Sequence, residues 1–247
     1  LKHVFKSKEH RKEAKEFGDF AWLGRGFERL ADIELNASNY ENVLTYANEA
    51  LRAFQHAGSL EGYSDALSRQ LHAHVALGNL EQALDLGFLQ LKRTQAKGLE
   101  RDHVLALAEI ALAYHEMGAD DLALDFATEA LSKAEASGLG GRSLLYVHTT
   151  LGLAYEGLGN YQAALRHYMQ SLDLISSGGL WNRTIAICHG NIGYAYLELG
   201  DFEKAIHHFR KELSIARSTG YSQEQAYALV YLGDYCFRTR LYELARR

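Results

Sequence analysis

The sequence predicts an all-α fold, built as a right-handed superhelix of stacked helical hairpins. Three observations support this prediction. The 247 residues contain no proline, they contain 22 glycines, and small residues recur at intervals of 40 or 41 positions. Proline is excluded from helix interiors, and glycine commonly ends a helix. This composition is therefore typical of helices that are separated by glycine turns.

The repeat is clearest at two positions that carry small side chains in every copy except at Leu71 and Val43. The first small position is occupied by Ala31, Leu71, Ala111, Gly152, Gly193 and Gly233. The second small position follows twelve residues later and is occupied by Val43, Ala83, Ala123, Ala164, Ala205 and Ala245. Small side chains at a contact let two helix axes approach closely. The spacing therefore predicts a tight pair of helices in each repeat, here called the first and the second helix.

Glycine marks both ends of these predicted hairpins. The turns between the two helices read LGN at 77–79, MGA at 117–119, LGN at 158–160 and LGD at 199–201. Further glycines end the second helices, at Gly18, Gly58, Gly98, Gly138, Gly179 and Gly220. Glycine adopts the left-handed conformation that closes a helix, and a following Asn or Asp can cap the next one. Because one hairpin cannot bury its apolar face alone, the copies are expected to stack as a solenoid.

Two segments of the chain resemble the tetratricopeptide repeat. They are GLAYEGLGNYQAALRHY at 152–168 and GYAYLELGDFEKAIHHF at 193–209. The usual unit of that family has about 34 residues and a proline near its end, whereas this unit has 40 or 41 residues and a glycine there. The chain therefore resembles the long-repeat subclass found in bacterial signalling proteins and in kinesin light chain.

This resemblance divides the chain into tandem repeats over residues 20–247. Their approximate limits are 20–58, 59–98, 99–138, 139–179, 180–220 and an incomplete 221–247. Residues 1–19 are expected to form either the end of a partial repeat or a capping helix. We expect the last repeat to stop inside its second helix, as in a piece cut from a longer array.

Composition argues against several classes of function. The net charge of −5 does not favour nucleic acid as a partner. A membrane-spanning helix needs roughly 18 to 20 consecutive apolar residues. No apolar run in this sequence approaches that length. Two cysteines in a chain of this length indicate a reducing compartment, and both are expected to be small buried residues. We therefore expect a cytoplasmic protein with no nucleic-acid or membrane partner.

The sequence offers no catalytic, cofactor or metal motif that would indicate an enzyme. The segment SGLGGR at 137–142 lacks the Lys-Ser/Thr that follows a phosphate-binding loop. His167 and His208 share one position in neighbouring repeats and are expected to face each other, but two ligands make a poor zinc site. His148 and His189 lie at a packing position, where they are either satisfied core residues or pH sensors.

The family resemblance implies that the first helices line a concave groove which holds a peptide or a partner segment. The groove positions lie six and two residues before the first small position and one residue after it. The candidate contact residues are Arg25, Arg29, Arg69, His72, Glu109, Tyr146, Thr150, Asn191, Tyr194, Tyr227 and Tyr231. The groove is expected to be basic toward its N-terminal end and aromatic toward its C-terminal end.

The resemblance also assigns roles to some of these residues. An Asn at the position of Asn191 holds the ligand backbone, because an amide both donates and accepts hydrogen bonds. Arg29 and Arg69 can bind a carboxylate through two hydrogen bonds. We therefore expect a non-enzymatic scaffold or sensor domain for proteins or peptides, within a larger bacterial signalling or regulatory protein. The alternative is a self-association module that forms homo-oligomers through its ends.

Overall fold

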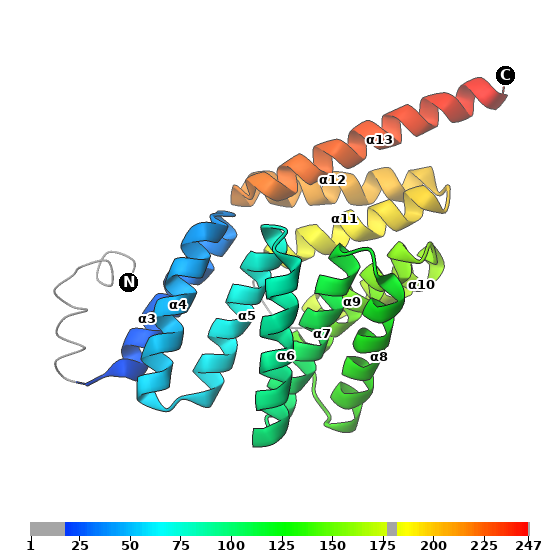
Figure 1. Cartoon of the computed structure of the whole chain (residues 1–247). Coiled ribbons are helices and arrows are strands. Elements are labelled where there is room, and N and C mark those ends of the chain that lie inside the picture. Colours follow the sequence, from blue (N-terminus) through cyan, green and yellow to red (C-terminus); the bar gives the residue numbers. More distant parts are fainter. Residues whose placement is uncertain (1–17, 177–181, 247) are drawn as a thin grey trace. The chain divides into compact units, whose positions relative to one another are not determined.

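The computed structural model describes residues 18–176 and 182–246. Within these ranges the chain consists of α-helices and turns, so the predicted all-α fold is confirmed (Figure 1). The helices are α3 (Phe20–Asn36), α4 (Tyr40–Ala57), α5 (Leu60–Ala76), α6 (Leu80–Lys97), α7 (Glu100–Glu116), α8 (Asp120–Ala136), α9 (Gly141–Gly157), α10 (Tyr161–Ser176), α11 (Asn182–Glu198), α12 (Phe202–Thr219) and α13 (Ser222–Arg246). The expectations for residues 1–17 and for Gly179 lie outside the described residues.

The helices belong to two compact units, Leu1–Glu116 and Met117–Arg247. In the first unit each helix from α3 to α7 packs against the next, and α5 also contacts α3 and α7. In the second unit each helix from α8 to α13 packs against the next, and α11 also contacts α13. The contacts α3–α5, α5–α7 and α11–α13 indicate stacked hairpins, because in each of them a first helix lies beside the first helix of the following repeat.

The glycine turns take the backbone conformation that the sequence predicts. Gly78, Gly159 and Gly200 have φ angles of 75°, 72° and 77°. In the first hairpin, which has no glycine at this point, Ser38 adopts a φ of 57°. A left-handed residue ends the first helix and lets the chain reverse into the second. The hairpin register read from the glycines is therefore the register of the structure.

The predicted caps form at some of these turns only. The Asp201 carboxylate accepts a hydrogen bond from the Lys204 backbone N–H at 3.2 Å. The side chain of Asn79 caps no backbone N–H. In the first turn, which has no glycine, the side chain of Asn39 also caps none, and its amide donates to Glu34 at 2.9 Å. The amide of Asn39 is thus used to hold the two arms of its hairpin together.

Close helix packing explains the glycines at the first small position. A Cβ atom added to Gly193 would lie 2.6 Å from the ring of Phe209, which enters from the second helix. Gly152 faces Tyr168 in the same way. Ala164 and Ala205, at the second small position, are fully buried. The aromatic ring of the second helix therefore occupies the space that a larger first-helix residue would need.

The last hairpin differs from the expectation. The sequence predicts a turn near 239–241 and a second helix after it, but α13 runs without a break from Ser222 to Arg246. The residues there are Thr-Arg-Leu, so no glycine is present to take the left-handed conformation. As a result Leu229, at the packing position, is 54% exposed, whereas its counterpart Leu67 is 2% exposed.

Candidate ligand-binding surface

Arg69 lies at the centre of an ionic network between α3 and α5. Its Nη1 is 2.9 Å from a Glu28 oxygen, and its Nε donates to an Asp32 oxygen at 2.8 Å. Nη1 also donates to the backbone carbonyl of Asp65 at 2.7 Å. The prediction that Arg69 is available to bind a ligand carboxylate therefore does not fit the structure, because two carboxylates of the protein already neutralise it.

Glu109 on α7 is also unavailable as a surface contact, because only 2% of it is exposed. Burial raises the pKa of its carboxyl to about 8, against a smaller opposite effect from a hydrogen bond with Ser68. One Glu109 oxygen has no hydrogen-bond partner among the described residues. Glu109 is therefore a mostly protonated interior residue at neutral pH, and this part of the first unit is not the basic surface that the sequence predicts.

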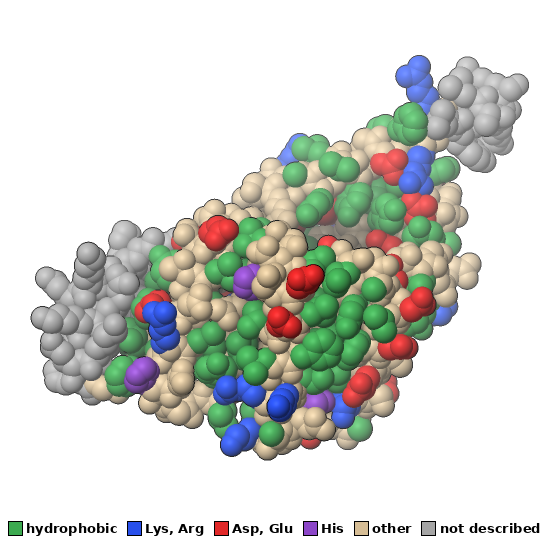
Figure 2. All heavy atoms as spheres, viewed as in Figure 1, with side chains coloured by type: hydrophobic (Ala, Val, Ile, Leu, Met, Phe, Trp, Pro, Cys, Tyr) green, Lys and Arg blue, Asp and Glu red, His purple; other side chains and the backbone are tan. Residues whose placement is uncertain are grey.

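The remaining first-unit candidates are more accessible. Arg25 and Arg29, both on α3, are exposed, and His72 on α5 is half-buried. On the face drawn in Figure 2, charged side chains of both signs are scattered among apolar ones. These three residues remain candidates for ligand contact in the first unit.

In the second unit, the candidates on α9 divide between the surface and the interior. Tyr146 is half-buried. Thr150 is 3% exposed, and its hydroxyl donates to the backbone carbonyl of Val147 at 2.9 Å within the same helix. The prediction that Thr150 contacts a ligand is therefore wrong for the structure as it stands, because its polar group is buried and satisfied.

Asn191 and three tyrosines form the best-defined part of the predicted surface. Asn191 and Tyr194 are both half-buried on α11. The Tyr194 ring lies 5.8 Å from the ring of Tyr231 on α13 and 6.3 Å from that of Tyr161 on α10. We call Tyr161, Tyr194 and Tyr231 the tyrosine cluster. Their separations are those of favourable aromatic pairs.

The tyrosine cluster packs against the hydrophobic core of the second unit. The Tyr231 ring stacks on buried Phe209 at 5.2 Å, with 18° between the ring planes. Burial, with Glu198 as a smaller contribution, raises the pKa of Tyr194 to about 12. The Tyr194 phenol is therefore protonated at neutral pH, and it forms a side-chain hydrogen bond with Glu198. Tyr227, further toward the start of α13, is 51% exposed and accepts a hydrogen bond from Gln223 at 3.2 Å.

The histidines pair differently from the prediction. His167 does not face His208; it faces His148 in its own hairpin, with 3.1 Å between the two Nδ1 atoms. His208 faces His189 in the same way at 3.0 Å. The two arms of one hairpin bring these rings together, whereas successive second helices do not. No cluster of three or more metal-binding side chains occurs in the described part of the chain.

The two cysteines also differ from each other. Cys188 is 1% exposed, as predicted, and burial raises the pKa of its thiol to about 12. Cys236 is exposed, so the prediction that both are buried is wrong. In the described part of the chain α13 runs unbroken past Cys236, so no second helix covers this position there.

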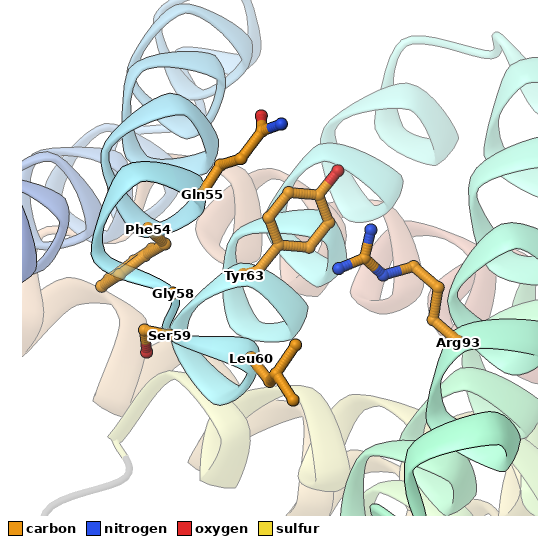
Figure 3. Close-up of a pocket in the computed structure, with 7 residues that line it drawn as sticks. All are labelled: Phe54, Gln55, Gly58, Ser59, Leu60, Tyr63 and Arg93. Atoms are coloured by element: carbon orange, nitrogen blue, oxygen red, sulfur yellow. The ribbon is translucent and has the colours of Figure 1, made fainter.

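A pocket in the first unit was not predicted from the sequence (Figure 3). It has a volume of about 190 Å³ and lies among the end of α4, the start of α5 and the end of α6. Its lining residues are Phe54, Gln55, Gly58, Ser59, Leu60, Tyr63 and Arg93. The signal that could have indicated it is the repeat itself. At the positions of Tyr63 and Arg93, the fourth and fifth repeats carry only Leu or Ile.

No described helix is both long enough and apolar enough to cross a membrane. No curated protein matches the chain significantly in sequence. Models of the tetratricopeptide repeat match residues 145–177 and 186–218. The first match lies over the hairpin α9–α10 and the second over the hairpin α11–α12 of the second unit. The second match includes Asn191 and Tyr194.

Solved structures of tetratricopeptide-repeat proteins share the fold at low sequence identity. A thermophilic protein of this kind from Thermus thermophilus is 19% identical, with a TM-score of 0.62 over 85% of this chain and 98% of that chain. A Rap protein complexed with the competence and sporulation factor is 14% identical, with a TM-score of 0.64 over 92% and 74%.

A signal-transduction ATPase from Pyrococcus horikoshii, which has a tetratricopeptide-repeat sensor, is 19% identical with a TM-score of 0.61. The likeness covers 94% of this chain and 36% of that one. At these identities the likenesses concern the fold alone. Together with the two matched repeats and the hairpin register, they show that this chain is a tetratricopeptide-repeat protein.

Proposed function

We propose that the chain is a non-enzymatic scaffold or sensor domain that binds a peptide or a segment of a partner protein. The first helices of the second unit carry the binding surface. Asn191 holds the ligand backbone, and Tyr194 and Tyr231 contact its side chains. Tyr146 and Tyr227 extend this surface, and Arg25, Arg29 and His72 are candidate contacts in the first unit.

One observation carries this proposal. Asn191 and Tyr194 lie on one helix, and Tyr194 contacts Tyr231 on the neighbouring first helix. An amide therefore stands close in sequence to rigid aromatic side chains on packed helices. Tyrosine is frequent among the residues that dominate binding energy, because it offers a large rigid surface and a polar tip. The tyrosine cluster is thus suited to an extended or helical peptide with apolar side chains.

Two of the similar structures support a peptide as the ligand class. They are the Rap protein with its bound factor and a plasmid Rap conjugation gene regulator in complex with a Phr peptide. The sensor of the Pyrococcus ATPase supports a place within a larger regulatory protein. The sequence suggested that Arg69 binds a carboxylate of the ligand. We do not include this contact in the proposal, because Glu28 and Asp32 already neutralise Arg69.

The proposal is tested by selecting ligands from a random peptide library and titrating one of them by isothermal titration calorimetry. Asn191→Ala and Tyr194→Ser should each weaken binding about tenfold or more, as expected for central contacts. Gln162→Ala is the matched control, because Gln162 is exposed on the second helix α10. Equal affinities for all four proteins would place the site elsewhere.

A second candidate function is self-association through α13. Val230 and Phe237 on this helix are 66% and 64% exposed, and side chains of this size favour burial. Multi-angle light scattering over a range of protein concentrations tests this alternative. A dimer that Phe237→Ser converts to a monomer, while Met169→Ser on α10 does not, would support it. A monomer at all concentrations would exclude it.

A further inference from the structure

We propose that the pocket between α4, α5 and α6 binds an oxyanion group, a carboxylate above all, that is attached to a small apolar body. This site lies in the first unit and uses other residues than the peptide surface, so it goes beyond the proposed function. The lining residues, drawn in Figure 3, supply one cation, two polar groups without a partner among the described residues, and an apolar wall.

The cation is Arg93 of α6. Its guanidinium carbon lies 3.9 Å from the centroid of the Tyr63 ring on α5, which is the geometry of a cation–π contact. No carboxylate pairs with Arg93 among the described residues. Glu61, in the first turn of α5, lies instead 3.4 Å from Arg101 of α7. Arg93 is therefore oriented by a neutral aromatic face while its N–H groups are left for a ligand oxyanion.

Two more polar groups line the pocket without a partner in the described part of the chain. They are the side-chain amide of Gln55 and the hydroxyl of Tyr63. The Tyr63 ring lies between the side chains of Gln55 and Arg93 (Figure 3). The Ser59 hydroxyl accepts a hydrogen bond from the Gly62 backbone N–H at 3.3 Å, which uses one of its acceptor positions. A ligand oxyanion can therefore be held by Arg93 together with the Tyr63 hydroxyl, while Gln55 lies across the Tyr63 ring from Arg93 (Figure 3).

The pocket also sets the size of the apolar body. Its volume of about 190 Å³ corresponds to roughly six water molecules at about 30 Å³ each, which is the space of a single amino-acid residue. Phe54, which is 3% exposed, forms a wall, and Leu60, which is 40% exposed, lies at the opening. These dimensions fit the end of a chain or a small acid better than a larger metabolite.

Comparison among the repeats shows that packing does not require this polar pair, although the third repeat also carries polar residues, His103 and Lys133, at the same positions. The positions of Tyr63 and Arg93 are occupied by Leu144 and Leu174 in the fourth repeat, and by Ile185 and Ile215 in the fifth. Aliphatic residues therefore satisfy the packing needs of the same position in the same fold. Packing alone does not require an aromatic ring with a charged group above it at this point.

The test is a titration followed by the backbone amide signals in nuclear magnetic resonance spectra. The probes are N-acetyl-leucine, its neutral amide and inorganic phosphate. We expect N-acetyl-leucine to shift the amide signals of residues 58–63 saturably, and the neutral amide to bind at least about tenfold more weakly, because hydrogen bonds to charged groups are the stronger ones. Phosphate should displace N-acetyl-leucine, since both present an oxyanion to Arg93.

Variants separate the role of Arg93 from the stability of the fold. Arg93→Gln should lower the affinity for N-acetyl-leucine about tenfold or more, whereas Arg52→Gln, at an exposed position on α4, should not change it. The double variant Tyr63→Leu with Arg93→Leu recreates the residues of the fourth repeat, so it should fold and lose binding. The proposal is overturned if N-acetyl-leucine causes no saturable shift, if its neutral amide binds equally well, or if only phosphate binds.

Discussion

His148 on α9 and His167 on α10 face each other with 3.1 Å between their Nδ1 atoms. At this distance one ring donates a hydrogen bond from its Nδ1 and the other accepts it at an unprotonated Nδ1. Burial lowers the pKa of both rings, so both are neutral at pH 7. The next hairpin repeats the arrangement with His189 and His208 at 3.0 Å. A pair of this kind is expected to fail when both rings are protonated, because both Nδ1 atoms then carry a proton and neither can accept.

These histidine pairs predict that the second unit loses stability in acid. Burial, followed by the repulsion of His148 and Arg166, lowers the pKa of His167 to about 4. Burial also lowers the pKa values of His189 and His208 to about 4, with repulsion from Lys211 and His207 as smaller causes.

The sign of this effect follows from proton binding. A histidine whose folded pKa is depressed binds fewer protons in the folded than in the unfolded state, so its contribution is full above about pH 6.5 and is lost toward pH 4. We expect a loss of about 1 kcal/mol per pair between pH 7 and pH 5, a value reduced for solvent screening because one ring of each pair, His167 or His208, is half-buried.

Denaturant unfolding at pH 7 and pH 5 measures this loss. The double variant His148→Leu with His167→Phe, which uses residue types found at these positions in other repeats, should reduce it. His56→Gln, at an exposed histidine on α4, should not. If the double variant keeps the full pH dependence of the wild type, the pairing is not its source.

Replacing either of two glycines at the same repeat position by alanine should change the stability of the protein in opposite directions. Gly193→Ala places a Cβ atom 2.6 Å from the Phe209 ring, and such overpacking costs about 1–3 kcal/mol. Gly233→Ala meets no atom within 4 Å, so the better helix propensity of alanine should stabilise α13 by up to about 1 kcal/mol. Thermal unfolding of the two variants checks both signs. Equal changes in melting temperature would contradict the finding that Gly193 is closely packed and Gly233 is not.

The network around Arg69 predicts a stability defect rather than a binding defect. Arg69→Ala leaves the carboxylates of Glu28 and Asp32 without their cation, and loss of one partner from such a partly buried network costs about 1–3 kcal/mol. Arg25→Ala removes an exposed charge and should change stability by less than about 0.5 kcal/mol. Urea unfolding compares the two, and similar midpoints would mean that the network contributes little.

Glu109 predicts a pH dependence of opposite sign to that of the histidines. Its pKa is raised to about 8, mainly by burial, so the folded state holds the proton more tightly and stability falls as pH rises from about 4.5 to 8. Glu109→Gln keeps the shape and removes the titration. The variant should therefore gain stability relative to the wild type at pH 8 and lose this advantage at pH 5. A difference that does not change with pH would show that Glu109 is ionised in the fold.

The register of the hairpins could be predicted from the sequence because it rests on local requirements. A turn needs a left-handed residue, which glycines such as Gly78 and Gly200 supply, and a close helix contact needs a small residue such as Ala205. The continuous α13 was not predicted, although Thr239, Arg240 and Leu241 contain no glycine. The repeat pattern suggested a turn that these residues do not form.

The contacts of the site could be predicted only in part. Asn191 and Tyr194 follow directly from the repeat position. The neutralisation of Arg69 by Asp32 joins residues 37 positions apart in different hairpins, and the distance between those helices is not visible in the sequence. The pairing of His148 with His167 likewise depends on which helices are in contact. Burial, which removes Thr150 and Glu109 from the surface, is decided by the same packing.

The position of a bound peptide tests the central claim most directly. A peptide selected from a random library and carrying a photoreactive phenylalanine is cross-linked to the protein, and the attached residues are identified by mass spectrometry. The tyrosine cluster predicts cross-links within 187–198 on α11 and 224–235 on α13. Cross-links confined to the second helices α10 and α12 would contradict the assignment of the ligand to the first-helix surface.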